Sequence, residues 1–170
     1  NLTFSNMNTL TPIFWIVPSA AVVALGFAYF FYRQMMKASE GTDKMKTIAQ
    51  FVREGAMSYL RQQYKVVGIV FLCMVVVFSI MAYGFDMQNP WVPVAFLSGG
   101  FFSAFAGYLG MKTATNASAR TANAAIGSLN KGLQIAFRSG AVMGLVVVGL
   151  VLIDISAWYL ILNYFTDMDL

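Results

Sequence analysis

Four long apolar segments alternate with more polar stretches along this chain. The segments cover residues 13–32, 66–85, 91–111 and 141–165 and are 20 to 25 residues long. About 20 apolar residues in a helix that rises 1.5 Å per residue span a hydrocarbon core of roughly 30 Å. The pattern therefore predicts an all-α membrane protein with four transmembrane helices.

The basic residues divide the two sides of such a bundle. All 11 Lys and Arg residues lie within residues 33–65 and 112–138. Four crossings place these stretches on one side, opposite both termini and the connection between the second and third segments. This asymmetry predicts cytoplasmic loops at 33–65 and 112–140, with both termini outside. It favours contact with anionic membrane lipid and not with nucleic acid, because the cations are dispersed and mostly flank the spans.

The cytoplasmic stretches have helical patterns of their own. Apolar residues recur at helical spacing over residues 43–65, and Thr42 is placed as an N-cap, so an amphipathic helix is expected to run into the second span. Residues 112–131 contain no proline. They are expected to extend the third helix beyond the membrane before a turn at 127–130.

Small residues form a stripe on each of the last two helices. The stripes consist of Ala95, Gly99, Ser103 and Gly107 on the third helix, and of Gly132, Ala136, Gly140 and Gly144 on the fourth. A spacing of four residues places small side chains on one helix face, where another backbone can approach closely. These residues are predicted to pack against each other's helix or against further helices, with ligand contact as the alternative.

Three charged residues are candidates for chemistry. Asp154 is the one acid inside an apolar segment, which is typical of ion pathways; the alternative is pairing with a neighbouring helix or contact with outer water. Lys112 and Arg120 are candidates for contact with a cytoplasmic anion or a lipid headgroup. The alternative for both is a solvated helix face or salt bridges to the loops.

Composition excludes several classes of site. The chain has no His and one Cys, so His-based catalysis and an intrachain disulfide are excluded. The two basic stretches contain only Glu40, Asp43 and Glu54 as acids, a poor set for Mg²⁺, which needs oxygen ligands. No nucleophile–base pair and no Gly-rich phosphate loop can be assembled. We therefore assign no catalytic, metal-binding or cofactor-binding residue.

Three stretches together resemble the membrane-bound, ion-translocating inorganic pyrophosphatases. They are REGAMSYLRQQYK at residues 53–65, GYLGMKTATNASART at 107–121 and AFRSGAVMG at 136–144. Their order and spacing are similar to those in the N-terminal quarter of that family. The resemblance extends over residues 33–165.

The resemblance implies a longer chain of about sixteen membrane helices, with this segment in an outer ring. It also implies a homodimer that hydrolyses Mg²⁺-bound pyrophosphate on the cytoplasmic side and pumps H⁺, Na⁺ or both outward. Some members need K⁺. The family's Mg²⁺-binding and gate residues lie on later helices, so this segment alone is expected to be inactive. The expected location is a bacterial cytoplasmic membrane.

Two other functions stay open at this point. One is a self-standing four-helix membrane scaffold or assembly subunit. The other is a small transporter that uses Asp154. A reading frame that continues into acidic motifs would favour the pyrophosphatase.

Overall fold

The computed structural model describes residues 12–85 and 89–165, and the protein consists of helices joined by short connections. The elements are, in chain order, η1 (Pro12–Trp15), α1 (Ile16–Met36), α2 (Asp43–Tyr83), α3 (Val92–Gly127) and α4 (Leu129–Phe165). Helices α1 to α4 are each long and apolar enough to cross a membrane. The prediction of an all-α membrane protein with four spanning helices is therefore confirmed.

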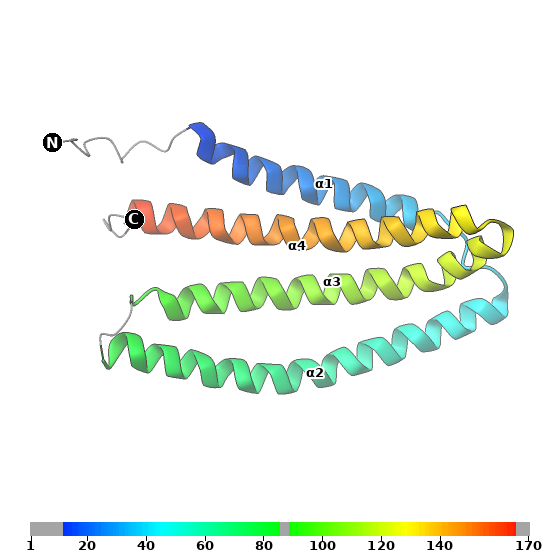
Figure 1. Cartoon of the computed structure of the whole chain (residues 1–170). Coiled ribbons are helices and arrows are strands. Elements are labelled where there is room, and N and C mark those ends of the chain that lie inside the picture. Colours follow the sequence, from blue (N-terminus) through cyan, green and yellow to red (C-terminus); the bar gives the residue numbers. More distant parts are fainter. Residues whose placement is uncertain (1–11, 86–88, 166–170) are drawn as a thin grey trace.

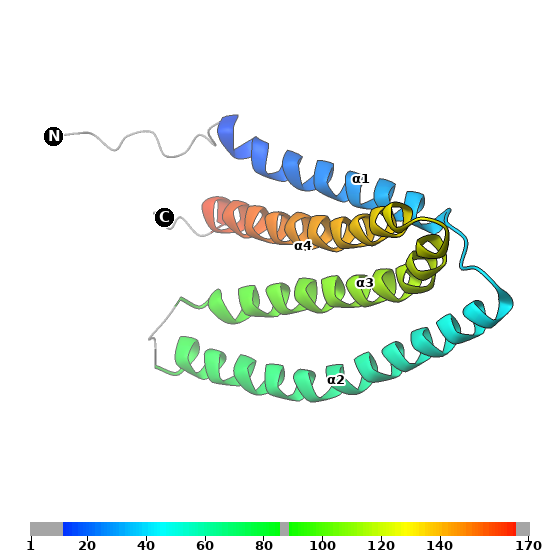
Figure 2. The ribbon, with the colours of Figure 1, turned by 45° about the vertical axis from the view of Figure 1, so that its right-hand side comes forward.

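The helices lie side by side in the order α1, α4, α3, α2 (Figures 1 and 2). Helix α4 packs against both α1 and α3, whereas α2 contacts only α3 among the described helices. The α1–α2 and α3–α4 connections lie together at one end of the bundle (Figure 1). We call this the basic end, because the Lys and Arg residues belong to the helix segments nearest to it.

The start of α2 follows from its local sequence. The Thr42 hydroxyl accepts a hydrogen bond from the backbone N–H of Met45 (3.4 Å), which confirms the predicted N-cap. The helix then continues for 41 residues without a break. The amphipathic part and the second span are therefore one continuous helix, as expected.

The predicted turn at residues 127–130 is much shorter in the structure. Only Ser128 leaves helical conformation, with φ −167° and ψ 122°, and α4 begins at the next residue. The Ser128 N–H donates to the Ala124 carbonyl, and the Ser128 carbonyl accepts from the Gly132 N–H. One residue thus satisfies backbone groups of both helix ends, so a longer turn is not needed.

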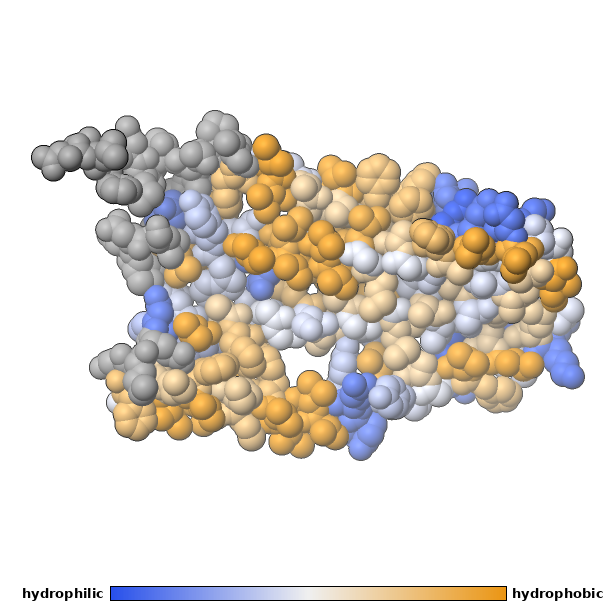
Figure 3. All heavy atoms as spheres, in the orientation of Figure 1, coloured by the Kyte–Doolittle hydropathy of each residue, from blue (hydrophilic) through white to orange (hydrophobic). Residues whose placement is uncertain are grey.

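The buried side chains of α1, α3 and α4 form two small clusters. The larger is in the middle of the bundle and consists of Ala28, Ala106, Val142, Val146 and Leu150. The other lies toward the basic end and consists of Met35, Ala117 and Ile135. Most of the remaining apolar surface is exposed on the outside of the helices (Figure 3). An apolar exterior is what a membrane helix bundle requires.

Helix α2 is held against α3 by aromatic side chains. The Phe71 ring stacks on Phe96 with centroids 4.6 Å apart and lies over Gly100. Toward the basic end, the Tyr64 hydroxyl donates to the Ala104 carbonyl. Figure 3 shows an opening between α2 and the other helices near the middle of the molecule. The position of α2 therefore depends on a few discrete contacts.

Candidate functional site at the basic end

The α1–α2 connection turns sharply at Gly41, which has a φ of +91°. A Cβ atom at this position would lie 2.6 Å from Met45 Sδ and 2.7 Å from Asn123 Oδ1, so both side chains would have to shift, and the backbone conformation itself favours glycine. The Gly41 N–H donates to Ser39 Oγ (3.1 Å). This turn presents the side chain of Glu40 to α2 and α3.

The Glu40 carboxylate bridges two helices. Its Oε1 lies 2.8 Å from Nη1 of Arg53 on α2 and 2.8 Å from Nη1 of Arg120 on α3. The side chains are 17%, 29% and 10% exposed for Glu40, Arg53 and Arg120, so water screens these ion pairs only partly. Ionic hydrogen bonds of this length are stronger than neutral ones.

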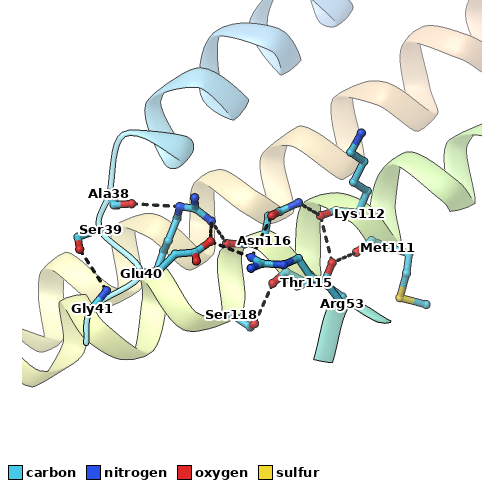
Figure 4. Close-up of polar contacts among 11 residues, drawn as sticks. Ala38, Ser39, Glu40, Gly41, Arg53, Met111, Lys112, Thr115, Asn116 and Ser118 are labelled. Atoms are coloured by element: carbon cyan, nitrogen blue, oxygen red, sulfur yellow. Dashed lines mark hydrogen bonds and ion pairs between the residues drawn. The ribbon is translucent and has the colours of Figure 1, made fainter. Parts of the chain in front are cut away.

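The arginines also bind backbone and amide groups. Arg120 Nε donates to the Ala38 carbonyl (3.0 Å), and its Nη1 donates to the Asn116 carbonyl (2.6 Å). Arg53 Nη1 donates to Asn116 Oδ1 (3.3 Å). We call Glu40, Arg53, Asn116 and Arg120 the Glu40 cluster. It fastens the α1–α2 connection, α2 and α3 to one another (Figure 4).

The chemistry of the Glu40 cluster is structural. It combines one carboxylate with two guanidinium groups, which stay protonated at physiological pH. Both guanidinium groups bind the same carboxylate oxygen, and the cluster contains no hydroxyl, thiol or amine that could act as a nucleophile. Removing Glu40 would leave two poorly hydrated guanidinium groups without their counter-ion.

Acidification should release the Glu40 cluster. The hydrogen bond from Arg53, helped by the charge of Arg120 and opposed by burial, holds the pKa of Glu40 below its ordinary 4.5. Because this pKa is depressed in the folded state, the stabilisation is complete above the unfolded carboxyl's pKa and is lost as pH falls through the folded value. The difference in melting temperature between the wild-type full-length protein and Glu40→Gln should therefore shrink as the pH falls below about 4.5. A difference that stays constant at acidic pH would contradict this assignment.

The sequence singled out Arg120 but not its partners. In the structure Arg120 pairs with Glu40 and donates to two backbone carbonyls. This matches the alternative given for Arg120 in the sequence analysis, a salt bridge to a loop. Anion or lipid contact by Arg120 stays a prediction. Glu40 and Arg53 were missed as a pair because 13 residues and a connection separate them. The only sequence signal for this pair was Gly41, because a glycine turn at this position directs the side chain of the preceding Glu40.

Lys112 lies on α3, on the side of α1, and its surroundings differ from those of Arg120. Its Nζ is 5.9 Å from the centre of the Tyr108 ring. It lines a cavity together with residues of α1 and α4. Contact of Lys112 with an anion or lipid headgroup stays a prediction and is developed below.

Asp154 is far from the basic end. Ser98 Oγ lies 2.9 Å from Asp154 Oδ1 and 3.0 Å from the Ala95 carbonyl, so its single hydrogen can be donated to only one of them at a time. Trp158 Nε1–H donates to Ser98 Oγ (2.6 Å). These bonds join α3 to α4 and support helix pairing by Asp154. An ion-pathway role for Asp154 stays a prediction.

Replacing Ser98 with alanine is expected to loosen the α3–α4 contact. The change removes the described hydrogen-bond partner of both Trp158 and Asp154 and should cost about 1 kcal/mol, typical of hydrogen bonds between membrane helices. The matched control is Ser79→Ala, because the Ser79 hydroxyl bonds only to the Val75 carbonyl of its own helix (2.8 Å). The two variants are compared by thermal melting of the full-length protein in detergent. Equal melting temperatures would rule out the interhelical role.

The small residues of the predicted stripes lie in different surroundings. A Cβ on Gly99 would lie 3.6 Å from Asp154 Oδ2, and one on Gly107 would lie 3.0 Å from the Tyr64 hydroxyl. Ser103 is exposed, and added Cβ atoms on Gly140 and Gly144 would meet nothing within 4 Å. Gly132, at the start of the α4 stripe, is buried against α3, where an added Cβ would lie 2.8 Å from Ala125 Cβ. Packing of the part of the stripe with Gly140 and Gly144 stays a prediction that concerns helices outside the described chain.

The described residues do not fit a magnesium site. They include no group of three or more His, Cys, Asp or Glu residues that could hold a metal. Glu40 is taken up by two arginines, Asp43 pairs with Lys46 (2.9 Å), and Glu54 accepts from Gln50 (2.9 Å). No step that involves Mg²⁺ can be derived from these side chains.

The sequence pattern of one family, described as inorganic H⁺ pyrophosphatase, matches residues 22–169. The chain belongs to this family. A protein of Bacteroides thetaiotaomicron is named "Putative K(+)-stimulated pyrophosphate-energized sodium pump". It is 72% identical to this pyrophosphatase-family chain over 92% of the chain. A K⁺-insensitive pyrophosphate-energized proton pump of Methanosarcina mazei is 37% identical over 93% of this chain. A K⁺-stimulated pyrophosphate-energized sodium pump of Thermotoga maritima is 37% identical over 88% of this chain.

The matches confirm the resemblance found in the sequence. They cover only 21%, 22% and 20% of these three relatives, so the chain spans about a fifth of their length. The chain is therefore an integral membrane segment of a pyrophosphatase family whose relatives include both sodium and proton pumps.

Proposed function

We propose that this chain is the N-terminal part of a longer membrane pyrophosphatase that couples the hydrolysis of Mg²⁺-bound pyrophosphate to outward ion pumping. The observation that carries the proposal is the 72% identity to a pyrophosphate-energized pump over 92% of this chain. The four apolar helices are consistent with an origin in a multi-helix pump. The reaction, substrate and metal are those of the whole protein.

Sodium is the ion that we propose for this pump, with K⁺ as an activator. The 72% identical relative is named as a K⁺-stimulated sodium pump, whereas the Methanosarcina mazei proton pump is 37% identical. Proton pumping is the second candidate, because relatives at the same 37% identity include a proton pump and a sodium pump.

The segment itself is proposed to brace the pump and not to catalyse. The three described acids of the basic end are occupied by arginine, lysine or amide partners, so the Mg²⁺ and pyrophosphate ligands would come from the rest of the protein. The α4 stripe, with Gly140 and Gly144 open to the outside, would receive another helix of the outer or inner ring. A homodimer of the complete protein is the proposed assembly.

The basic end is proposed to face the cytoplasm of a bacterial cell, with both chain termini outside. Single cysteines at Ser118, which is exposed on α3, and at Gln88, between α2 and α3, test this in a Cys73→Ser background. A membrane-impermeant thiol reagent should label Gln88→Cys in intact cells and Ser118→Cys only in inverted vesicles. The reverse labelling pattern would overturn the orientation.

Pyrophosphate hydrolysis separates the pump from the alternative functions. In lipid with Mg²⁺, the full-length protein should release phosphate from pyrophosphate, and K⁺ should increase the rate. The 170-residue chain prepared in the same way should release none. Hydrolysis by the short chain would refute the bracing role, and failure of the full-length protein would favour a scaffold.

A further inference from the structure

A cavity of about 300 Å³ opens between α1, α3 and α4, beside the larger apolar cluster, and reaches Lys112 on its side toward the basic end. Its walls are mostly apolar and include Leu25, Ala28, Leu109, Val142 and Val146. Its volume is at the lower limit of pockets that bind small molecules. Thr113 also lines the cavity, but its hydroxyl donates to the Leu109 carbonyl (2.8 Å). The cavity therefore offers room for a slender apolar group.

Cations and tyrosines surround the mouth of this cavity. Tyr29, Tyr32 and Lys112 line it, and the same two tyrosines line an adjoining groove that includes Arg33 and Lys37. The hydrophilic end of α1 is visible as a separate patch beside the apolar surface (Figure 3). In the sequence, Arg33 and Lys112 directly follow the first and third apolar segments, so they belong at the membrane interface.

The cations around the cavity mouth, Arg33, Lys37 and Lys112, form no ion pair within the part of the chain that the structure describes. The three described ion pairs use Lys46, Arg53 and Arg120. Arg33 and Lys112 instead lie over aromatic rings, 5.6 Å from the centre of Tyr29 and 5.9 Å from the centre of Tyr108. Tyrosine contacts of this kind neutralise no charge. Within the described residues, the mouth of the cavity is therefore positive and contains no anionic side chain.

We propose that this cavity binds an anionic phospholipid. One acyl chain would occupy the apolar space between α1, α3 and α4, and the phosphate would lie between Lys112 and Arg33. The joint arrangement selects a lipid over free phosphate or pyrophosphate, because a free anion would use the cations and leave the apolar walls without a partner. This proposal is independent of which ion the complete protein pumps.

Native mass spectrometry of the full-length protein tests the site, with dioleoyl phosphatidylglycerol and dioleoyl phosphatidylcholine as probes. Phosphatidylglycerol should be retained in preference. Because each cation near the membrane surface contributes about 1 kcal/mol, Arg33→Gln with Lys112→Gln should weaken its retention roughly 30-fold. Lys131→Gln is the matched control, since Lys131 is exposed on α4 and does not line the cavity.

The apolar part of the site is tested separately. Leu109→Trp narrows the cavity and leaves both cations in place, so it should reduce retention of phosphatidylglycerol as well. Equal retention of the two lipids would overturn the proposal, as would retention that is unaffected by Arg33→Gln with Lys112→Gln. Displacement of the lipid by pyrophosphate would also overturn it, because it would identify a soluble anion as the ligand.

Discussion

Glu40→Gln is expected to loosen the basic end of the bundle while leaving the four helices formed. Glutamine can replace one hydrogen bond but not the charge that balances Arg53 and Arg120, so two largely buried guanidinium groups lose their counter-ion. Because all three side chains retain some contact with water, the cost should be about 2 kcal/mol, below that of a fully buried pair.

Hydrogen–deuterium exchange of the full-length protein measures this effect locally. About 2 kcal/mol corresponds to roughly 30-fold faster exchange, and it should appear in the amides of residues 37–46. Glu54→Gln is the control, because Glu54 is exposed and accepts one hydrogen bond from Gln50 of its own helix. Similar exchange in the two variants would show that the cluster does not fasten the connection.

Gly100→Ala is expected to displace α2 from α3. A Cβ atom on Gly100 would lie 2.1 Å from Phe71 Cζ and 2.3 Å from Phe71 Cε2, far inside van der Waals contact. The Phe71 ring is also stacked on Phe96, so it cannot turn away without breaking that contact. Overpacking of this kind costs about 1–3 kcal/mol, and α2 has no other described helix to hold it.

Thermal melting in detergent and exchange along α2 measure the displacement. Gly26→Ala on α1 is the matched control, since its added methyl group would meet nothing within 4 Å inside the described chain. Gly110→Ala is intermediate, because its clash is with the flexible end of Met143 (2.7 Å to Cε). Equal stability of Gly100→Ala and Gly110→Ala would contradict the tight Phe71 contact.

The sequence predicted those features that depend on local pattern. Segment length and hydropathy were sufficient for the four helices, and the position of Thr42 before a periodic apolar run was sufficient for the N-cap of α2. The turn at residues 127–130 was placed correctly but made too long, because composition does not reveal that Ser128 alone can close one helix and start the next. Local sequence signals thus predict the positions of the helices more reliably than the lengths of the connections between them.

The Glu40 cluster could not be predicted, because it depends on which helix faces meet. Glu40, Arg53 and Arg120 come from three separate parts of the chain, and each alone is typical of a solvated surface. The glycines illustrate the same limit. A spacing of four residues identified Gly140 and Gly144, where an added Cβ would meet nothing within 4 Å, but not Gly100 and Gly110, where it would lie 2.1 Å from Phe71 and 2.7 Å from Met143. Periodicity identifies a face but not the neighbour that covers it.

Pyrophosphate-driven sodium uptake is the most direct test of the proposed function. Inverted membrane vesicles that contain the full-length protein should accumulate radiolabelled sodium when Mg²⁺ and pyrophosphate are added. K⁺ should increase the uptake, and a protonophore should not abolish it. Proton uptake without sodium uptake would contradict the assigned ion, and the absence of any pyrophosphate-dependent ion movement would contradict the pump itself.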